Sequence, residues 1–272
     1  MKKKFKIIYF LLLVLLVFSF CQGNSPCFSF SSRVSYVTTY PEDHPAIKND
    51  EPVDLVFYFH GAGGEEEDIL KSFASGGLDL EKERYYRKNI VFHSFCYDTH
   101  FHWASPEITK DSIKKIQRIS KKYNTRKIML IGISSGGTLA LNVLSLANNK
   151  LKNLISDILA VFPITDYEYT LSHNHSEWLA PELKKHFSQY SNPKKQMKES
   201  SPITFVSKIP SHTRIILIEG TRDKVVDSAQ VERFYSEIKK INERNQLIKW
   251  NTDHDVRPSE KEFEVLVKDL LK

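Results

Sequence analysis

The sequence predicts an α/β domain in which a mostly parallel central β-sheet is flanked by helices and carries a small helical insertion. From residue 53 onward, apolar runs of strand length alternate with segments of helical period, which is typical of parallel sheets with right-handed crossovers. The runs are rich in β-branched residues and almost continuously apolar, as strands covered on both faces are. With 272 residues, 41% hydrophobic and 12% aromatic, the chain can bury a sizeable core and does not resemble a disordered sequence.

The predicted elements follow one another along the chain. Residues 24–52 form an N-terminal segment rich in Ser, Pro, Asn and Thr, in which residues 35–40 alternate in polarity like an edge strand. Further on, helix-period segments place isoleucines such as Ile113 and Ile116 on one face and Lys and Arg on the other. The predicted strands are 53–59, 89–95, 127–131, 158–162, 214–218 and 246–250, and the predicted helices are 66–75, 109–123, 135–147, 228–241 and 259–271.

We expect one domain over residues 53–272, because no Gly/Ser-rich or Pro-rich linker interrupts it. Residues 166–201 break the alternation with a mixture of Tyr, His, Trp, Lys and Pro. This break predicts a helical, lid-like insertion over the edge of the sheet.

The N-terminus has the pattern of an export signal. Residues 1–6 contain four lysines and no acid, and residues 7–18 are all apolar, a run too short to span a bilayer. Small residues at Cys21 and Gly23 predict cleavage before Asn24, so that residues 1–23 are removed. Alternatively, the signal ends at residue 20 and Cys21 is the lipid-accepting cysteine of a lipoprotein, although Phe20 departs from that pattern. We therefore expect an exported protein that is secreted, periplasmic or tethered to a membrane through Cys21.

Export also allows disulfide formation, and Cys27 and Cys96 are candidates to pair. The net charge of +6 and the pI near 9.0 are largely a property of the signal. Removing its four lysines leaves +2 on the mature chain, and the remaining lysine pairs are scattered over predicted helices. We therefore expect no nucleic-acid partner. The oligomeric state is not indicated by the sequence.

A candidate nucleophile lies between the strand 127–131 and the helix 135–147. In Gly132-Ile133-Ser134-Ser135-Gly136 the two glycines flank Ser134 at the spacing of a sharp strand-to-helix turn that projects a serine hydroxyl. Ser135 fails the same test because Ile133 would occupy the small position. Its backbone N–H, at the helix N-terminus, is instead a candidate oxyanion donor. A glycine-rich turn without chemistry, or a phosphate-binding turn, is the alternative interpretation.

A second glycine-rich loop follows the strand 53–59. In His60-Gly61-Ala62-Gly63-Gly64 the glycines allow the backbone to turn an N–H toward the neighbouring strand end, with Ala62 or Gly63 as the donor. We interpret His60 as a ring that supports this loop. The acidic residues that follow at 65–68 would repel a phosphate.

The acid and the base of a serine mechanism are expected after the nucleophile in the chain. Asp223 lies on the loop after the strand 214–218, and His254 lies on the loop after the strand 246–250. Both loops are at carboxyl ends of parallel strands, so their side chains can meet Ser134. Asp166, which follows the strand 158–162, is the alternative acid.

These motifs resemble the α/β-hydrolase superfamily over residues 53–272. The segment 132–140, Gly-x-Ser-x-Gly-Gly-x-Leu-Ala, is similar to small esterases and to serine peptidases of the prolyl oligopeptidase type. The peptidases usually carry a large propeller domain that this sequence lacks, so the resemblance implies a small-molecule or lipid ester substrate. It also implies a substrate pocket that includes His60, and Trp103 resembles a tryptophan of secreted polyester and feruloyl esterases, although a packing role is equally compatible with it.

Two other classes compete with a serine esterase. A binding-only member of the fold is disfavoured, because all three residue types of the catalytic set are present. A metal-dependent hydrolase would need a ligand cluster, and the sequence has no His-Glu-x-x-His helix and no cysteine cluster. We expect no metal or cofactor and interpret the remaining histidines as surface residues: His93, His100, His102, His173 and His175.

Overall fold

The computed structural model describes residues 34–65, 88–99, 101–173, 176–256 and 260–271. Several predictions lie outside these residues: the signal with its cleavage site and Cys21, the helix at 66–75, and the histidines His100 and His175. Cys96 is buried and disulfide-bonded. Its pairing with Cys27 stays a prediction, because Cys27 also lies outside the described residues.

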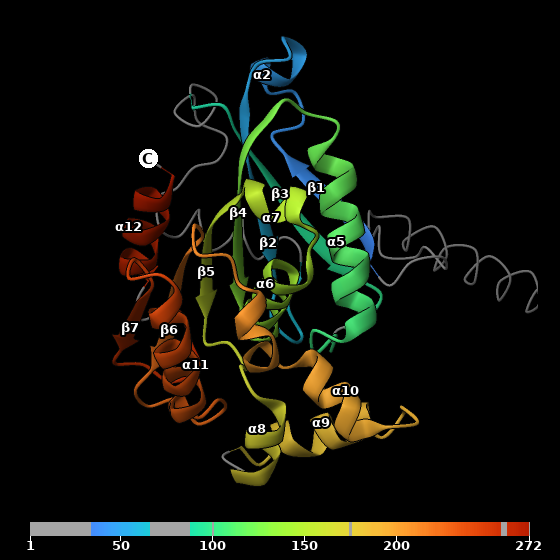
Figure 1. Cartoon of the computed structure of the whole chain (residues 1–272), viewed down its shortest axis with the longest axis vertical. Helices are drawn as coiled ribbons and strands as arrows, with labels where there is room; N and C mark the ends of the chain where they lie inside the picture. The colour runs from blue at the N-terminus through green and yellow to red at the C-terminus, as the bar shows by residue number, and fades with distance from the viewer. Residues whose placement is uncertain (1–33, 66–87, 100, 174–175, 257–259, 272) are drawn as a thin grey trace, which may run out of the picture.

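A seven-stranded sheet forms the centre of the described part of the chain (Figure 1). Its order is β1-β3-β2-β4-β5-β6-β7, and all neighbours are parallel except β1 and β3. The predicted fold class is therefore confirmed, including the edge strand at 35–40. The strands are β1 Val34–Tyr40, β2 Val53–Phe59, β3 Ile90–Tyr97, β4 Thr125–Ile133, β5 Ile155–Val161, β6 Arg214–Gly220 and β7 Gln246–Trp250.

Helices connect the strands and cover both faces of the sheet. The α5 helix begins one turn earlier than predicted, because Ser105 caps it through the N–H of Ile108 and Pro106 occupies its first position. The helices are α2 Pro45–Lys48, α5 Pro106–Ser120, α6 Ser135–Leu146, α7 Asn149–Leu154, α8 Tyr167–His173, α9 Leu179–Phe187, α10 Pro193–Ser200, the 3₁₀ helix η1 Pro202–Lys208, α11 Ser228–Ile241 and α12 Glu260–Leu270. None of these described helices is long and apolar enough to cross a membrane.

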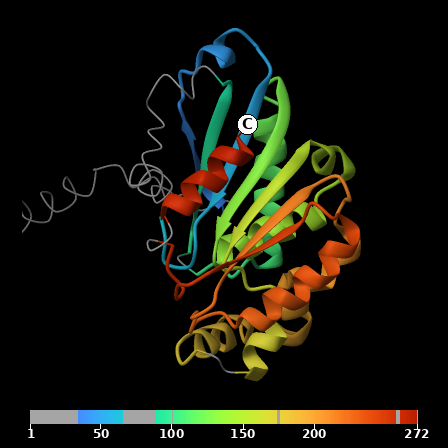
Figure 2. The ribbon, with the colours of Figure 1, turned by 90° about the vertical axis from the view of Figure 1, so that its left-hand side faces the viewer.

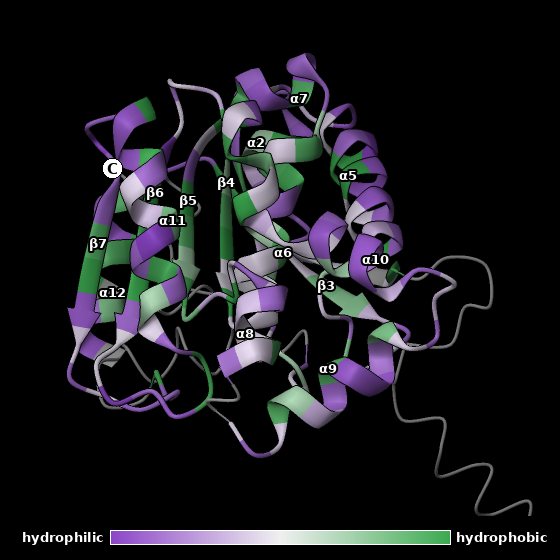
Figure 3. Cartoon of the chain, turned by 60° about the horizontal axis from the view of Figure 1, so that its bottom comes forward, coloured by the Kyte–Doolittle hydropathy of each residue, from purple (hydrophilic) through white to green (hydrophobic). Residues whose placement is uncertain are grey.

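Two apolar cores fill the space between the sheet and its helices. The larger core packs α5, α6 and α11 against one face, and the smaller core packs α12 against the other (Figure 2). The α6 helix is almost entirely buried because it crosses the middle of the sheet. Figure 3 shows the outcome, with largely green strands inside a shell of helices that carry purple stretches. The near-continuous apolarity of β2 and β3 is thus explained by burial along their whole length.

The segment predicted as a helical insertion consists of α8, α9 and α10. Figure 1 shows these helices beyond the carboxyl ends of the parallel strands, away from α2 at the opposite end. The catalytic candidates also follow carboxyl ends of strands, so the fold places the insertion and these candidates at the same end of the sheet.

Candidate active site

Ser134 lies at a sharp turn between β4 and α6. Its backbone has φ 54° and ψ −123°, a conformation that non-glycine residues rarely adopt. The turn depends on the flanking glycines: a Cβ on Gly132 would lie 2.2 Å from the carbonyl oxygen of Gly136, and a Cβ on Gly136 would lie 2.1 Å from that of Phe59. Both distances are far inside van der Waals contact. The glycines are therefore required sterically at this site.

Two hydrogen bonds join Ser134 to the two residues predicted from the later strands. The Oγ of Ser134 is 2.9 Å from Nε2 of His254, and Nδ1 of His254 is 2.7 Å from Oδ2 of Asp223. The other carboxylate oxygen, Oδ1 of Asp223, accepts from the N–H groups of Val225 and Val226 at 2.8 and 2.9 Å. Because a carboxylate can only accept, it receives the Nδ1 proton of His254 and leaves Nε2 to accept from the serine hydroxyl.

The loops after β6 and β7 are bound to each other, which brings Asp223 and His254 together. The N–H of Thr221 donates to the carbonyl of Trp250, and the N–H of Arg222 donates to the carbonyl of Thr252. Gly220 permits this approach, since a Cβ there would lie 2.8 Å from the Thr252 carbonyl oxygen. These contacts hold Asp223 and His254 close to each other.

Asp253 strengthens this support and was missed in the sequence. Its Oδ1 accepts from the N–H of Lys224 at 3.0 Å and from that of His254 at 2.7 Å, and these bonds lower the pKa of its carboxyl. Phe162 was also missed: its ring centroid lies 5.3 Å from that of His254. The position of Asp253 directly before His254 is a signal that could have indicated its role. Nothing in the sequence around Phe162 indicates its contact with His254.

The predicted oxyanion donors lie on the loop after β2 and at the start of α6. Gly61 packs against the nucleophile turn, since a Cβ on it would lie 3.3 Å from Cβ of Ser134. The N–H of Gly64 donates to the carbonyl of Gly61 and closes a tight turn, in which Gly63 has φ 74°. The N–H groups of Ala62 and Gly63, in the middle of this turn, do not take part in the hydrogen bond that closes it. Ser135 is the first residue of α6, where backbone N–H groups lack partners within the helix.

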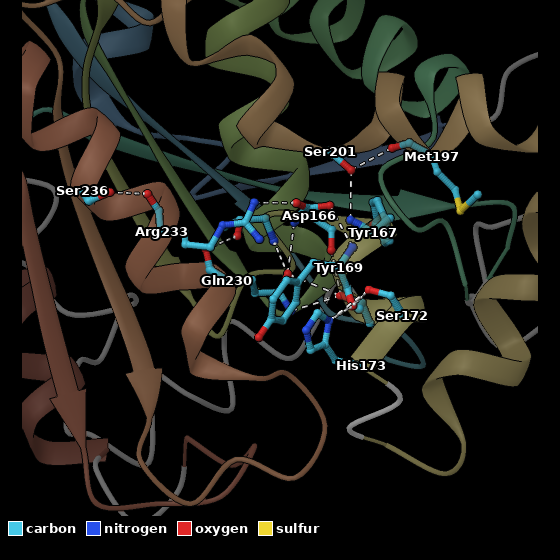
Figure 4. Close-up of polar contacts among 12 residues, drawn as sticks. Asp166, Tyr167, Tyr169, Ser172, His173, Met197, Ser201, Gln230, Arg233 and Ser236 are labelled. Carbon is cyan, nitrogen blue, oxygen red and sulfur yellow. Dashed lines mark hydrogen bonds and ion pairs between the residues drawn. The ribbon is translucent and has the colours of Figure 1, made fainter.

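Asp166, the alternative acid, is committed elsewhere (Figure 4). Its Oδ1 caps α8 by accepting from the N–H of Tyr169 at 3.0 Å, and its Oδ2 pairs with Arg233 of α11 at 3.1 Å. Next to it the buried Gln230 accepts from the N–H groups of Thr165 and Asp166, both at 3.0 Å. Asp166 therefore anchors the insertion to α11, and Asp223 is the carboxylate at His254.

Trp103 and His60, the predicted pocket residues, are both nearly fully buried. The ring of Trp103 contacts the more exposed rings of Phe101 and Trp178, with centroid distances of 5.6 and 6.3 Å. Its backbone carbonyl accepts from the hydroxyl of Tyr167 at 2.6 Å, which ties its loop to α8. Nδ1 of His60 lies 2.8 Å from the carbonyl of Gly61, within its own loop. The contact of Tyr167 with Trp103 therefore stabilises the loop after β3, and the contact of His60 with Gly61 stabilises the loop after β2.

The interpretation of His93 and His102 as surface residues is wrong. Both are fully buried, and burial lowers the pKa of each imidazole to about 3. His93 is buried because both faces of β3 are covered. His173 is exposed, as expected. Among the residues that the structure describes, no group of three or more His, Cys, Asp or Glu side chains is arranged to hold a metal ion.

The buried histidines predict acid sensitivity of the fold. A histidine with an ordinary pKa of 6.5 when unfolded and about 3 when folded binds its proton first in the unfolded state, so stability falls as the pH drops below about 6.5. The wild-type protein should lose free energy of unfolding between pH 7 and pH 5, and we expect His93→Gln to make this loss smaller by about 2 kcal/mol. Urea denaturation of both proteins at the two pH values measures this. An equal loss in wild type and variant would contradict the assignment of His93 as neutral.

The chain is similar to a known protein family and to several solved structures. The model of the prolyl oligopeptidase family matches residues 101–268, more than half of the chain. The fold is similar to the esterase Pf2001 of Pyrococcus furiosus, with a TM-score of 0.55 and 16% identity over 82% of this chain and 83% of the esterase. It is also similar to a fungal esterase of Rhizomucor miehei, with a TM-score of 0.60 and 15% identity over 86% and 78% of the two chains.

A peptidase shares the fold over a smaller part of its length. The Pyrococcus horikoshii acylaminoacyl peptidase has a TM-score of 0.57 and 14% identity over 80% of this chain, but only 36% of the peptidase is covered. No curated protein sequence matches the chain significantly. At these identities the structural similarity establishes the fold alone.

Proposed function

This chain belongs to the prolyl oligopeptidase family and is a serine hydrolase of the α/β-hydrolase superfamily. From that premise we propose that it hydrolyses carboxylic esters through an acyl-enzyme on Ser134, with His254 and Asp223 completing a catalytic triad. The observation that carries the proposal is the continuous hydrogen-bonded series from Ser134 Oγ through His254 to Asp223. Geometry of this kind activates a serine that is otherwise a poor nucleophile at neutral pH.

The proposed reaction has two steps with the same base. Nε2 of His254 takes the proton of Ser134 as Oγ bonds to the ester carbonyl carbon, and the carbonyl oxygen becomes an oxyanion. The N–H groups of Ser135 and of Ala62 or Gly63 stabilise that charge. His254 then gives the proton to the alcohol as the C–O bond breaks, and water repeats the sequence to release the carboxylic acid and free Ser134.

Ester hydrolysis is favoured over peptide hydrolysis by the extent of the structural similarity. The fold matches both esterases over about four fifths of their own length, against 36% of the acylaminoacyl peptidase. A peptidase remains the second candidate, because the matching family model describes prolyl oligopeptidases. A small-molecule or lipid ester is thus the proposed substrate class.

Paired chromogenic substrates test the proposal. We expect p-nitrophenyl esters, assayed as a series of rising acyl length, to be hydrolysed, and aminoacyl p-nitroanilides to show no turnover above background. A serine-directed phosphonate should abolish this activity and a chelator should not.

Turnover of the aminoacyl p-nitroanilides that is lost in Ser134→Ala would favour the peptidase, whatever the rate on the esters. Esterase activity that survives the phosphonate but is lost with the chelator would overturn the serine mechanism.

A further inference from the structure

We propose that His102, which follows β3 on the loop to α5, is a positioning residue that aligns the two halves of the oxyanion hole. The inference rests on the proposed serine mechanism and adds a residue to it. His102 is fully buried and lies against both segments that supply oxyanion donors. Its Nε2 is 3.3 Å from the carbonyl oxygen of His60 and 3.4 Å from Oγ of Ser135.

The hydrogen-bond partners of His102 fix its tautomer. The N–H of Ala104 donates to Nδ1 at 3.1 Å, so Nδ1 carries no proton. Burial holds the imidazole neutral by lowering its pKa to about 3, and its single proton is therefore on Nε2. Nε2–H is then a donor directed at the His60 carbonyl, with the Ser135 hydroxyl beside it.

This donor controls the direction of the backbone in the loop after β2. In a planar trans peptide the C=O and N–H point in opposite directions, so holding the carbonyl of His60 also orients the N–H of Gly61. The next peptide is held in the same way, because Nδ1–H of His60 donates to the carbonyl of Gly61 at 2.8 Å and thereby orients the N–H of Ala62. Two successive peptides are thus fixed by two imidazoles.

The rings around His102 hold this arrangement in place. The ring of Tyr97 lies 4.4 Å from that of His102 and 4.9 Å from that of His60, so it packs against both. At the other end, His102 meets Ser135, whose N–H is the donor from the start of α6. One neutral imidazole therefore links the donor from the β2 loop to the donor from the nucleophile turn.

Two conservative variants separate the two nitrogen atoms of His102. His102→Asn places an acceptor near the position of Nδ1 and keeps the bond from Ala104, but it lacks the donor to His60. His102→Gln can place an amide N–H near the position of Nε2 and restores that donor. His93→Asn is the matched control, because His93 is also fully buried and neutral but lies on β3 against Phe57 and Thr39.

The test measures kcat, KM and inhibition by a boronic acid, which forms a tetrahedral anionic adduct with an active-site serine, on a p-nitrophenyl ester. We expect His102→Asn to lower kcat about 10-fold to 100-fold with KM within about twofold, and to weaken boronic acid inhibition by the same factor as kcat. His102→Gln should stay within about threefold of the wild-type kcat, and His93→Asn should leave both kcat and inhibition unchanged.

The inference is overturned if His102→Asn retains the wild-type kcat, if its defect lies in KM, or if His93→Asn shows the same loss of kcat. Thermal unfolding identifies variants that do not fold. If His102→Asn is one of them, His102→Gln decides alone: a kcat near wild type supports the donor, and a loss of more than about tenfold in the folded variant contradicts it. Failure of the proposed function is distinguishable, because Ser134→Ala would then retain activity whatever the outcome at His102.

Discussion

Replacing Ser134 with alanine is expected to lower kcat for ester hydrolysis by about 10⁶-fold while the protein remains folded. The substitution removes the hydroxyl that lies 2.9 Å from His254 Nε2, so no acyl-enzyme can form. Binding is expected to persist, because the oxyanion donors are backbone groups that the substitution leaves in place. Steady-state assays on a p-nitrophenyl ester, with circular dichroism of both proteins, measure the two effects.

Ser145→Ala is the matched control for this experiment. Ser145 lies on the same helix, α6, is almost fully buried, and donates to the carbonyl of Leu141 at 2.9 Å. Its loss should cost about 1 kcal/mol of stability and leave kcat unchanged. If Ser134→Ala and Ser145→Ala were equally active, Ser134 could not be the nucleophile.

Asp223→Asn is expected to lower kcat by about 10⁴-fold, the second largest effect. The N–H groups of Val225 and Val226 require an acceptor, so the amide oxygen of the asparagine will face them. Its NH₂ group then faces Nδ1 of His254 and donates to it, which forces the proton onto Nε2. In that tautomer His254 cannot accept the proton of Ser134. The pH dependence and kcat of the variant on the same ester measure the loss.

Asp166→Asn serves as the isosteric control. Asp166 follows the neighbouring strand β5, but its carboxylate binds Arg233 and the N–H of Tyr169. We expect kcat within about threefold of wild type, and a stability loss of about 1 kcal/mol or less for the partly exposed ion pair. A larger loss of activity in Asp166→Asn than in Asp223→Asn would exchange the assigned roles of the two carboxylates.

Most of the fold could be predicted because its signals are local. The central parallel strands consist mainly of apolar residues, and β2, β7 and α11 have the predicted bounds. For residues 166–201 the sequence predicted a helical insertion, but it did not predict the division into α8, α9 and α10. Their anchoring through Gln230 and Asp166 joins positions more than sixty residues apart, which no local pattern reveals.

The candidate site divides in the same way. Ser134, Asp223 and His254 could be selected because each follows a strand at the carboxyl edge of a parallel sheet, where their side chains are brought together. The burial of His102 could not be predicted, since a His-x-His pair on a loop is common on protein surfaces. Its environment is created by Tyr97, His60 and Ser135, which come from three separate parts of the chain.

Labelling with a fluorophosphonate, followed by mass mapping of the peptides, measures directly whether Ser134 is the nucleophile. The reagent forms a covalent bond only with an activated serine. We predict one adduct, on Ser134, whose formation parallels the loss of esterase activity. It should be absent from Ser134→Ala and form much more slowly in His254→Ala. An adduct on another serine, or esterase activity that persists when Ser134 is fully labelled, would contradict this prediction.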